Sequence, residues 1–177
     1  MVHIVDCDID VMTKVCAGFE QIHMCGNHGD PIYHPQFHQL IRQFKHTNQD
    51  VSLSMDTNGA FRSRQWWKIT ADLLTKKDKV NFSIDGMPHQ NHIYRVNSRW
   101  DSVLDGIITL RENNPQITMV WKWIVFRYNQ DDLEAGIELA KQLGFDRFRM
   151  VRSYRSSADD PLTSNRSFDE LKERLRA

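Results

Sequence analysis

Cysteine is scarce in this sequence, and long apolar stretches are missing. The three cysteines among 177 residues, Cys7, Cys16 and Cys25, are too few and odd in number to form a disulfide framework. No apolar run approaches the roughly 18 residues that a membrane-spanning helix needs, and no signal-peptide pattern opens the chain. We therefore expect a soluble protein of the reducing cytoplasm, without a membrane partner.

The sequence also lacks an excess of charge of either sign, which argues against nucleic acid as a partner. Lys plus Arg and Asp plus Glu number 23 each, so no broad basic field is expected for a phosphate backbone. Hydrophobic residues make up 40% of the chain, which is enough for one domain with a buried core. We expect that domain over residues 1–155. A polar tail over 156–177 would follow, with a solvated linker from about residue 152 to 166 and a short helix near 168–175.

Segments typical of strands alternate with segments of helical spacing. Strands are predicted near residues 19–25, 51–55, 79–84, 117–126 and 145–151. Helices are predicted near residues 8–17, 35–44, 66–74, 100–110 and 130–143. This alternation predicts an α/β fold with parallel strands, as a barrel or an open sheet. Each strand is followed by polar residues or glycine, and five such ends on one rim would build one site.

The stretch from Phe19 to Pro35 is the clearest candidate for a ligand-binding loop. An apolar segment ends in Gly-Asn-His-Gly-Asp-Pro, residues 26–31, and helical spacing then begins. Gly26 and Gly29 permit backbone angles that other residues avoid and let main-chain groups approach a ligand closely. Asp30 adds a carboxylate at the mouth of the turn. Loops at the C-terminal ends of strands are where α/β proteins bind small molecules.

Several segments, taken in order, resemble motifs of the radical S-adenosylmethionine (SAM) enzymes. Gly29-Asp-Pro31 resembles the end of the Gly-Gly-Glu-Pro turn of that family, with Asp in place of Glu and two additional residues ahead. The segment VSLSMDTNG, residues 51–59, resembles a strand motif ending in Thr-Asn-Gly. The segment VNFSIDG, residues 80–86, with Arg95 beyond it, resembles the Ser-x-Asp-Gly motif and its arginine. Residues 125–130 and 139–146 resemble the fifth strand, the next helix and the sixth strand.

The resemblance spans roughly residues 19–153 and is nearest to the branch that modifies peptides or assembles cofactors. It implies a partial (βα)6 TIM-like barrel of parallel strands with outer helices, whose first βα unit is incomplete or missing. It also implies SAM as a cofactor and a peptide or protein as substrate. An intact parent would carry a [4Fe-4S] cluster and abstract hydrogen from the substrate with a 5′-deoxyadenosyl radical.

The resemblance assigns residues to parts of SAM. The turn at Gly29–Pro31, with Asp30, would accept hydrogen bonds from the amino group, and Arg95 would pair with the carboxylate. Ser83 and Asp85 would meet the ribose or the methionine portion, and Asn129 the ribose. Met150, with Val151, would lie near adenine. The expected cofactor-binding residues are Gly26, Gly29, Asp30, Pro31, Thr57, Asn58, Ser83, Asp85, Arg95, Asn129 and Met150.

The cysteine pattern departs from the family, whose cluster is held by Cys-x3-Cys-x2-Cys. Cys7, Cys16 and Cys25 are each nine residues apart, a spacing that offers no short loop for three thiolates. We therefore expect the cluster ligands to be absent and interpret the chain as an N-terminally truncated enzyme that is inactive alone. A degenerate paralogue without a cluster is the alternative. Independently of this choice, we expect the three cysteines to be small buried hydrophobic residues and not ligands. Truncation would leave the strand at 19–25 as an open sheet edge, which would lower solubility.

Two further functions stay open on the residues alone. Gly26-Asn27-His28 is similar to the Gly-Asn-His-Asp/Glu signature of metal-dependent phosphoesterases, in which Asn and His bind a two-metal site. A non-catalytic α/β module that binds a ligand or a protein partner is the other function.

Two local questions also stay open. His28, His34 and His38, with Cys25, offer ligands for zinc, and His34 and His38 are one helical turn apart. In the strand at 117–126, either Lys122 or the pair of Trp121 and Trp123 faces the substrate, because the two sets lie on opposite faces.

Overall fold

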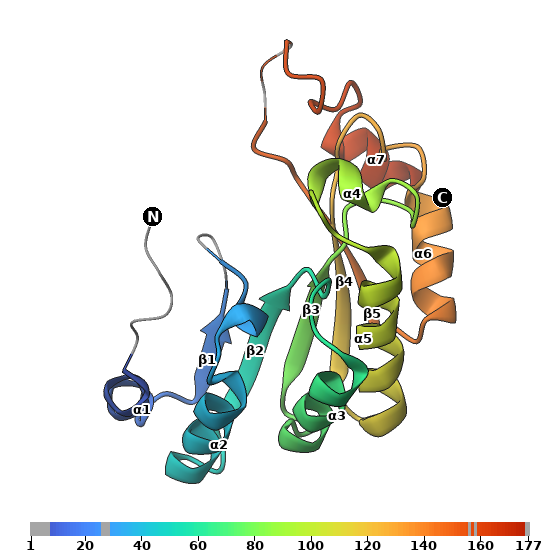
Figure 1. Cartoon of the computed structure of the whole chain (residues 1–177). Helices are drawn as coiled ribbons and strands as arrows, with labels where there is room; N and C mark the ends of the chain where they lie inside the picture. The colour runs from blue at the N-terminus through green and yellow to red at the C-terminus, as the bar shows by residue number, and fades with distance from the viewer. Residues whose placement is uncertain (1–7, 26–28, 156, 158, 176–177) are drawn as a thin grey trace.

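Five strands form one parallel sheet in the order in which they occur along the chain (Figure 1). The computed structural model describes residues 8–25, 29–155, 157 and 159–175. The strands are β1 (Gln21–Met24), β2 (Ser52–Thr57), β3 (Lys79–Ser83), β4 (Thr118–Ile124) and β5 (Arg147–Val151). Every neighbouring pair is parallel. A sequential parallel order is that of a TIM-type barrel, whereas a doubly wound sheet reverses its order part-way.

The predicted fold class is therefore confirmed: the chain forms an α/β sheet that is a partial TIM-like barrel. In the described residues β1 and β5 are the two edges of the sheet, and α1 (Ile9–Cys16) precedes β1 without a strand before it. The expectation of an open edge at the first strand agrees with this order, whereas its effect on solubility stays a prediction.

Helices connect the strands, and local sequence explains several of their starts. The helices after α1 are the short 3-10 helix η2 (Pro31–Tyr33), α2 (Phe37–Thr47), α3 (Arg64–Leu73), α4 (Asn91–Tyr94), α5 (Trp100–Asn113), α6 (Leu133–Gln142) and α7 (Phe168–Arg174). Side chains cap the first turns of four helices, because Asp8, Asp30, Ser63 and Ser167 accept hydrogen bonds from backbone N–H groups of α1, η2, α3 and α7, respectively. Helix α4 lies in a segment for which no helix was predicted. None of the helices in the described ranges is long and apolar enough to span a membrane.

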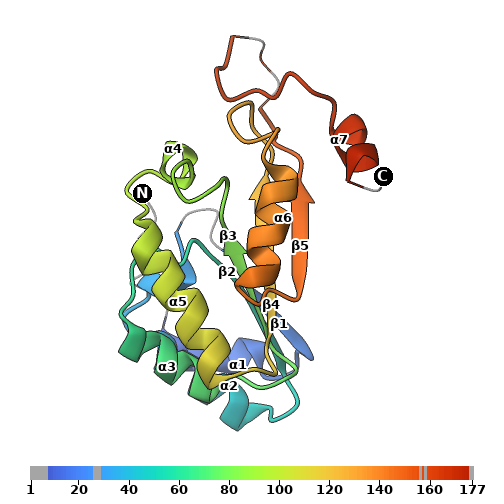
Figure 2. The ribbon, with the colours of Figure 1, turned by 90° about the vertical axis from the view of Figure 1, so that its right-hand side faces the viewer.

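The two faces of the sheet differ in cover and in composition. One face packs against α2, α3, α5 and α6 (Figures 1 and 2). The strand side chains on that face are apolar and at most 1% exposed: Leu53, Met55, Val80, Phe82, Met119, Trp121 and Trp123. The alternating side chains point to the other face. Asn81 and Val120 are buried there at 7% and 5% exposure. The others are half-buried or exposed: Ser52, Ser54, Asp56, Lys79, Ser83, Thr118, Lys122, Ile124, Arg147 and Arg149. The pair of Trp121 and Trp123 therefore belongs to the core, whereas Lys122 lies on the polar face.

Two glycines let helices approach the core closely. A Cβ at Gly136 of α6 would lie 2.5 Å from Cζ3 of Trp123, and a Cβ at Gly106 of α5 would lie 2.6 Å from Nε1 of Trp67. Real Cβ atoms do not approach this closely, so these positions exclude a side chain unless the indoles move. The buried tryptophans and the two glycines thus fit together as complementary surfaces.

The chain after β5 returns to the domain. The backbone N–H of Arg127 donates to the carbonyl of Leu162 (3.1 Å), Arg166 pairs with Asp131 (2.8 Å), and Leu171 of α7 is 1% exposed. Figure 2 shows α7 beyond the upper end of α6. The predicted short helix is confirmed as α7. The expectation of a solvated linker up to residue 166 is wrong from Leu162 onward, because these contacts tie the segment to the loop after β4; the boundary at residue 155 stays a proposal.

Candidate functional site

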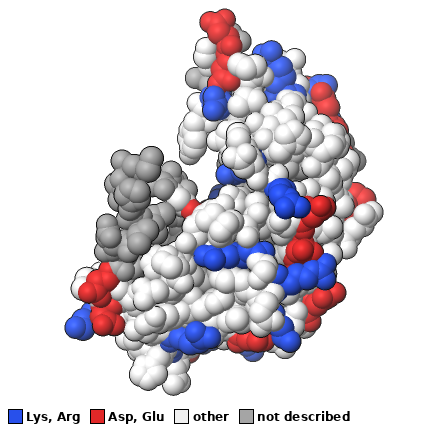
Figure 3. Space-filling view, in the orientation of Figure 1, with Lys and Arg blue, Asp and Glu red and all other residues white. Residues whose placement is uncertain are grey.

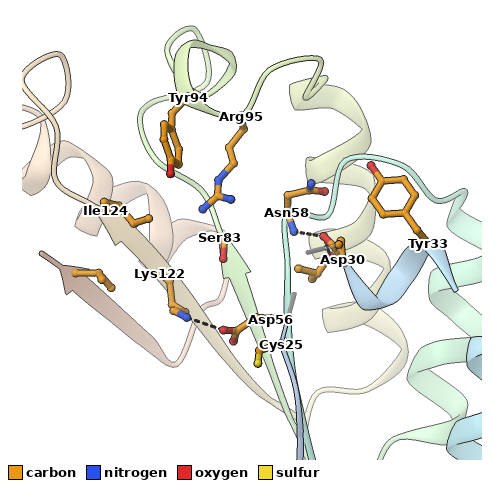
Figure 4. A pocket seen from close by; sticks show the side chains of 13 residues that line it. Cys25, Asp30, Tyr33, Asp56, Asn58, Ser83, Tyr94, Arg95, Lys122 and Ile124 are labelled. Carbon is orange, nitrogen blue, oxygen red and sulfur yellow. Dashed lines mark hydrogen bonds and ion pairs between the residues drawn. The ribbon is translucent and has the colours of Figure 1, made fainter. Parts of the chain in front are cut away.

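A cavity of about 560 Å³ lies at the C-terminal ends of the strands (Figures 3 and 4). We call it the rim cavity. Its lining comes from the segments that end all five strands: Cys25, Gly29, Asp30, Tyr33, Asp56, Thr57, Asn58, Ser83, Tyr94, Arg95, Lys122, Ile124 and Val151. The volume lies within the usual range for small-molecule sites. The five strand ends that the sequence placed on one rim therefore do meet around one cavity.

Arg95 reaches the rim cavity from the segment that follows α4, and Asp85 fixes its guanidinium. Its Nε and Nη2 both lie 2.7 Å from Oδ2 of Asp85. The Asp85 side chain has no exposed surface, whereas that of Arg95 is 25% exposed. Burial raises the pKa of Asp85, and the charge on Arg95 opposes that rise. The guanidinium fork offers five N–H donors, so the pair leaves donors that can meet a ligand.

The backbone around Asp85 is held by side chains from two other segments. Asn91 accepts a hydrogen bond from the Asp85 N–H (2.9 Å), and the Asp85 Oδ1 accepts one from the Ile124 N–H (2.6 Å). The Tyr128 hydroxyl and the Asn129 amide both donate to the Asp85 carbonyl. Burial raises the pKa of Tyr128, so its hydroxyl stays a donor. This network fixes the turn after β3 and, through it, the position of Arg95.

Asp30 fastens the loop after β1 to the end of β2. Its Oδ1 accepts from the Ile32 N–H (3.1 Å), which caps η2, and its Oδ2 accepts from the Thr57 hydroxyl (2.9 Å) and the Asn58 N–H (2.7 Å). Burial raises the pKa of Asp30, whereas these hydrogen bonds and the charge on Arg95 lower it. Asp30 and Arg95 both line the rim cavity, so the two groups face the same ligand space.

Lys122 and Asp56 form an ion pair on the polar face below the rim (Figure 4). The Lys122 Nζ lies 2.7 Å from Oδ2 of Asp56, and the side chains are 24% and 18% exposed. Asn81 donates to Oδ1 of Asp56 (2.7 Å), and Nε2 of His23 lies 3.6 Å from Oδ2. Residues of three other strands thus lie next to the Asp56 carboxylate. The ion pair of Asp56 and Lys122 places one negative and one positive charge beside the cavity.

Aromatic and aliphatic side chains complete the cavity wall. Tyr33 is 46% exposed and packs on Phe61, with ring centroids 4.8 Å apart. Tyr94 packs on Phe126 at 4.4 Å, and the Arg95 guanidinium lies 5.2 Å from the Tyr94 ring centroid. Ile124 and Val151 give the β4–β5 side an apolar surface. The rim cavity therefore suits a ligand with charged groups at one end and a flat apolar group at the other.

Solved structures with the same fold include two proteins whose structures contain SAM. SuiB from Streptococcus suis bound to S-adenosylmethionine superposes with a TM-score of 0.78 at 11% identity, over 99% of this chain and 41% of that chain. The structure of anSMEcpe with bound AdoMet and the Kp18Cys peptide gives 0.66 at 14% identity, over 88% and 46%. This chain therefore has the same fold as SuiB and anSMEcpe.

The proteins in these matching structures are considerably longer than this chain. A further structure, SuiB bound to the precursor peptide SuiA, gives a TM-score of 0.72 at 12% identity, over 96% of this chain and 39% of that chain. The chain thus spans about two-fifths of SuiB. No protein-family model matches the sequence, and no curated protein sequence matches it.

The residues that the radical SAM resemblance assigned to SAM fall into three groups. Those that line the rim cavity are Gly29, Asp30, Thr57, Asn58, Ser83 and Arg95. Pro31 begins η2 beside the cavity, and Asp85 and Asn129 lie beneath it, each 0% exposed. Met150 packs against the core while its neighbour Val151 lines the cavity, because successive strand residues face opposite ways. Gly26 lies outside the described residues.

Other lining residues were missed or left open by the sequence. From the sequence alone, Asp56 can either cap the turn after its strand or bind a ligand, and Lys122 is an alternative to the pair of Trp121 and Trp123. The alternation of side chains along each strand could have assigned both residues to the polar face. Asp56 alternates with the buried Leu53 and Met55, and Lys122 lies between two buried tryptophans. Tyr33 and Tyr94 gave no signal, because short helices formed by the connecting segments bring them to the rim.

The described residues do not fit a [4Fe-4S] cluster. Cys25 is exposed and lines the rim cavity, whereas Cys16 is half-buried on α1 and packs against the core. Cys7 lies outside the described ranges, within which no group of three or more His, Cys, Asp or Glu could hold a metal ion. The expectation that the cysteines are buried hydrophobic residues is wrong for Cys25, because its strand ends at the open rim.

The zinc and phosphoesterase interpretations find no support from the described histidines. His34 accepts a hydrogen bond at Nδ1 from the Gln36 N–H (3.1 Å), whereas Nε2 of His38 lies 2.9 Å from the Thr70 hydroxyl. The two imidazole rings thus form hydrogen bonds with different groups. Asn27 and His28, on which the phosphoesterase hypothesis depends, lie outside the described residues.

Proposed function

We propose that this chain is the SAM-binding part of a radical SAM enzyme that acts on a peptide or protein. Two findings support this: the fold matches structures that contain SAM, and the rim cavity carries a fixed arginine beside the loop at Gly29–Pro31. The position of Arg95 carries the proposal. A guanidinium held by a buried carboxylate is suited to a bidentate contact with the carboxylate of an amino acid.

The binding mode follows from the chemistry of the lining residues. The N–H donors of Arg95 that are directed away from Asp85 would bind the methionine carboxylate of SAM, and Asp85 would act as a positioning residue. Carbonyl oxygens of the Gly29–Pro31 loop would accept from the ligand amino group. Ser83 and Asn58 supply hydrogen-bonding groups for the ribose, and Ile124 with Val151 supplies an apolar surface for adenine.

The reaction of the complete enzyme is part of the same proposal. By resemblance, the parent would abstract hydrogen from its substrate with a 5′-deoxyadenosyl radical. The described residues contribute SAM binding and no cluster ligands, so we propose that the chain alone lacks this activity. Precursor peptide SuiA in the SuiB structure and the Kp18Cys peptide in the anSMEcpe structure support a peptide as the substrate class.

Titration of the chain with SAM by isothermal calorimetry tests the binding proposal. Arg95→Ala should weaken binding by about 10-fold or more, since a hydrogen bond to a charged partner contributes roughly 1.5–3 kcal/mol. The matched control is Arg42→Ala, because Arg42 is exposed on α2 and forms no ion pair with any described residue. Equal affinities of wild type and Arg95→Ala for SAM would show that Arg95 does not contribute to SAM binding.

A further inference from the structure

A second cavity lies on the polar face of the sheet, at the end opposite to the rim. Its volume is about 360 Å³, and we call it the basal cavity. It is lined by Gln21, Ile22, His23, Ser52, Ser54, Lys77, Asp78, Lys79, Thr118 and Arg147. Most of these residues belong to the N-terminal halves of β1–β5, which lie at the lower end of the sheet in Figure 1. The strand register places Lys79 between Ser54 and Thr118 on neighbouring strands.

The lining of the basal cavity is rich in hydrogen-bond donors with positive charge. Lys79 is half-buried and Arg147 is exposed, and neither forms an ion pair with a described residue. Thr118 and Gln21 form no side-chain hydrogen bond within the described ranges, so their polar groups are also available. A pocket with two cationic groups and uncommitted polar neighbours recognises oxyanions, because each oxygen can accept several charge-assisted hydrogen bonds.

The acidic groups near the basal cavity do not neutralise these cations. The Asp78 carboxylate is 0% exposed, lies 2.7 Å from Lys45 and accepts from the backbone N–H of Leu53. Asp50 pairs with Lys77 at 2.5 Å on the exposed side. Each acid therefore has its own cation, and the charges of Lys79 and Arg147 remain in excess. Because both side chains line the same cavity, an anion bound there would be attracted by both charges.

We propose that the basal cavity is a second binding site, for an anionic ligand whose carboxylate or phosphate oxygens bind Lys79 and Arg147. The cavity is larger than a single inorganic anion requires, so the ligand carries further atoms along the sheet. The anion site is independent of SAM binding, because Lys79 and Arg147 do not line the rim cavity.

The polar face leads from the basal cavity to the rim cavity. His23 lines the basal cavity, and its Nε2 lies 3.6 Å from Oδ2 of Asp56, which lines the rim cavity. Along β3 the step from Lys79 to Ser83 covers four residues, roughly 13 Å at about 3.3 Å per residue. A short extended peptide with one acidic residue could therefore occupy both cavities. The idea that one peptide occupies both cavities rests on the proposed function, whereas the anion site does not.

Nuclear magnetic resonance of the 15N-labelled chain without SAM tests the anion site. The probes are a tetraglutamate peptide with blocked termini, pyrophosphate and, as a neutral control, the matching tetraglutamine peptide. We expect at least one anionic probe to shift the backbone amides of Lys79, Thr118 and Arg147, with binding that weakens as salt is raised. Lys79→Gln and Arg147→Gln should each weaken that probe about 5-fold, because the two cations are partly or fully exposed and such a charge pair contributes at most about 1 kcal/mol. Lys68→Gln on α3 and Arg42→Gln on α2 are the matched controls and should not change binding.

The outcomes separate the two sources of the anion. Tighter binding of the tetraglutamate peptide identifies a carboxylate ligand, and tighter binding of pyrophosphate identifies a phosphate ligand; either supports the site. Shifts by neither anionic probe, equal binding of the tetraglutamine peptide, or affinities that Lys79→Gln and Arg147→Gln leave unchanged would overturn it. Mapping on the wild-type chain keeps the test valid if a variant is unstable. Because SAM is absent, failure here would leave the SAM proposal untouched.

Discussion

Nε and Nη2 of Arg95 both lie 2.7 Å from one oxygen of Asp85, a carboxylate with no exposed surface. Asp85 follows β3 and holds Arg95, which lines the rim cavity, so the same ion pair affects both the stability of the turn and the shape of the cavity. The same carboxylate binds the Ile124 N–H through its other oxygen, so it also ties β3 to β4. Asp85 does not line the rim cavity, so we expect it to affect a ligand through Arg95, whereas its motif suggested direct contact with SAM.

Asp85→Asn should lower the free energy of unfolding by about 3 kcal/mol, because it leaves the partly buried Arg95 charge without its partner. Chemical denaturation of both proteins measures the change. Asp105→Asn is the matched control, since Asp105 pairs with Arg64 on the surface, and its loss should cost less than about 1 kcal/mol. Similar costs for the two substitutions would contradict a buried structural role for Asp85.

Gly136→Ala should destabilise the chain by about 1–3 kcal/mol, because the added methyl group would lie 2.5 Å from the Trp123 ring. This cost outweighs the gain in helix propensity that alanine brings to α6. Gly18→Ala is the control, since a Cβ there meets nothing within 4 Å. Thermal unfolding of both variants checks the prediction, and a Gly136→Ala variant as stable as wild type would show that Trp123 repacks freely.

His38 should make the chain less stable in acid. Burial lowers the pKa of His38 below its ordinary value of 6.5, and the charges on Arg42 and Arg62 act in the same direction. As the pH falls below about 6.5, the unfolded chain binds more protons at this residue than the folded chain, so the free energy of unfolding decreases. Between about pH 7.5 and pH 5.5, wild type should therefore lose more stability than His38→Gln. An equal loss in both proteins would contradict this assignment.

Cys25 should report ligand binding at the rim cavity. Cys25 is exposed and lines the cavity, whereas Cys16 is half-buried on α1, so iodoacetamide should modify Cys25 faster. Saturating SAM should slow the modification of Cys25 and leave the rate at Cys16 unchanged. Peptide mass spectrometry follows both sites in one sample, so Cys16 is an internal control. If SAM slowed both cysteines equally, or neither, binding at the rim would not be the cause.

Much of the fold follows from local sequence. Strand and helix segments were predicted close to their observed positions because apolar spacing reports which face of each element is buried. Alternation in Ser52–Thr57 separates the core side from the polar side without any further information. The tail was harder to predict: the polar segment up to Arg166 suggests solvent exposure, whereas Leu162 and Arg166 bind the loop after β4.

The site was predictable where a residue follows a strand directly and less so elsewhere. Asn58, Ser83 and Arg95 reach the rim cavity as the motifs suggested. Asp85 and Met150 do not line it, because one is buried beneath the turn and the other belongs to the core-facing side of its strand. Such distinctions depend on burial and on the packing of distant segments, which motif spacing does not specify.

A crystal structure of the chain with SAM would show directly whether the rim cavity binds it. We expect SAM in the rim cavity, with its carboxylate at about 3 Å from the guanidinium of Arg95 and its adenine against Ile124 and Val151. SAM bound elsewhere, or bound in the rim cavity with its carboxylate directed away from Arg95, would contradict it.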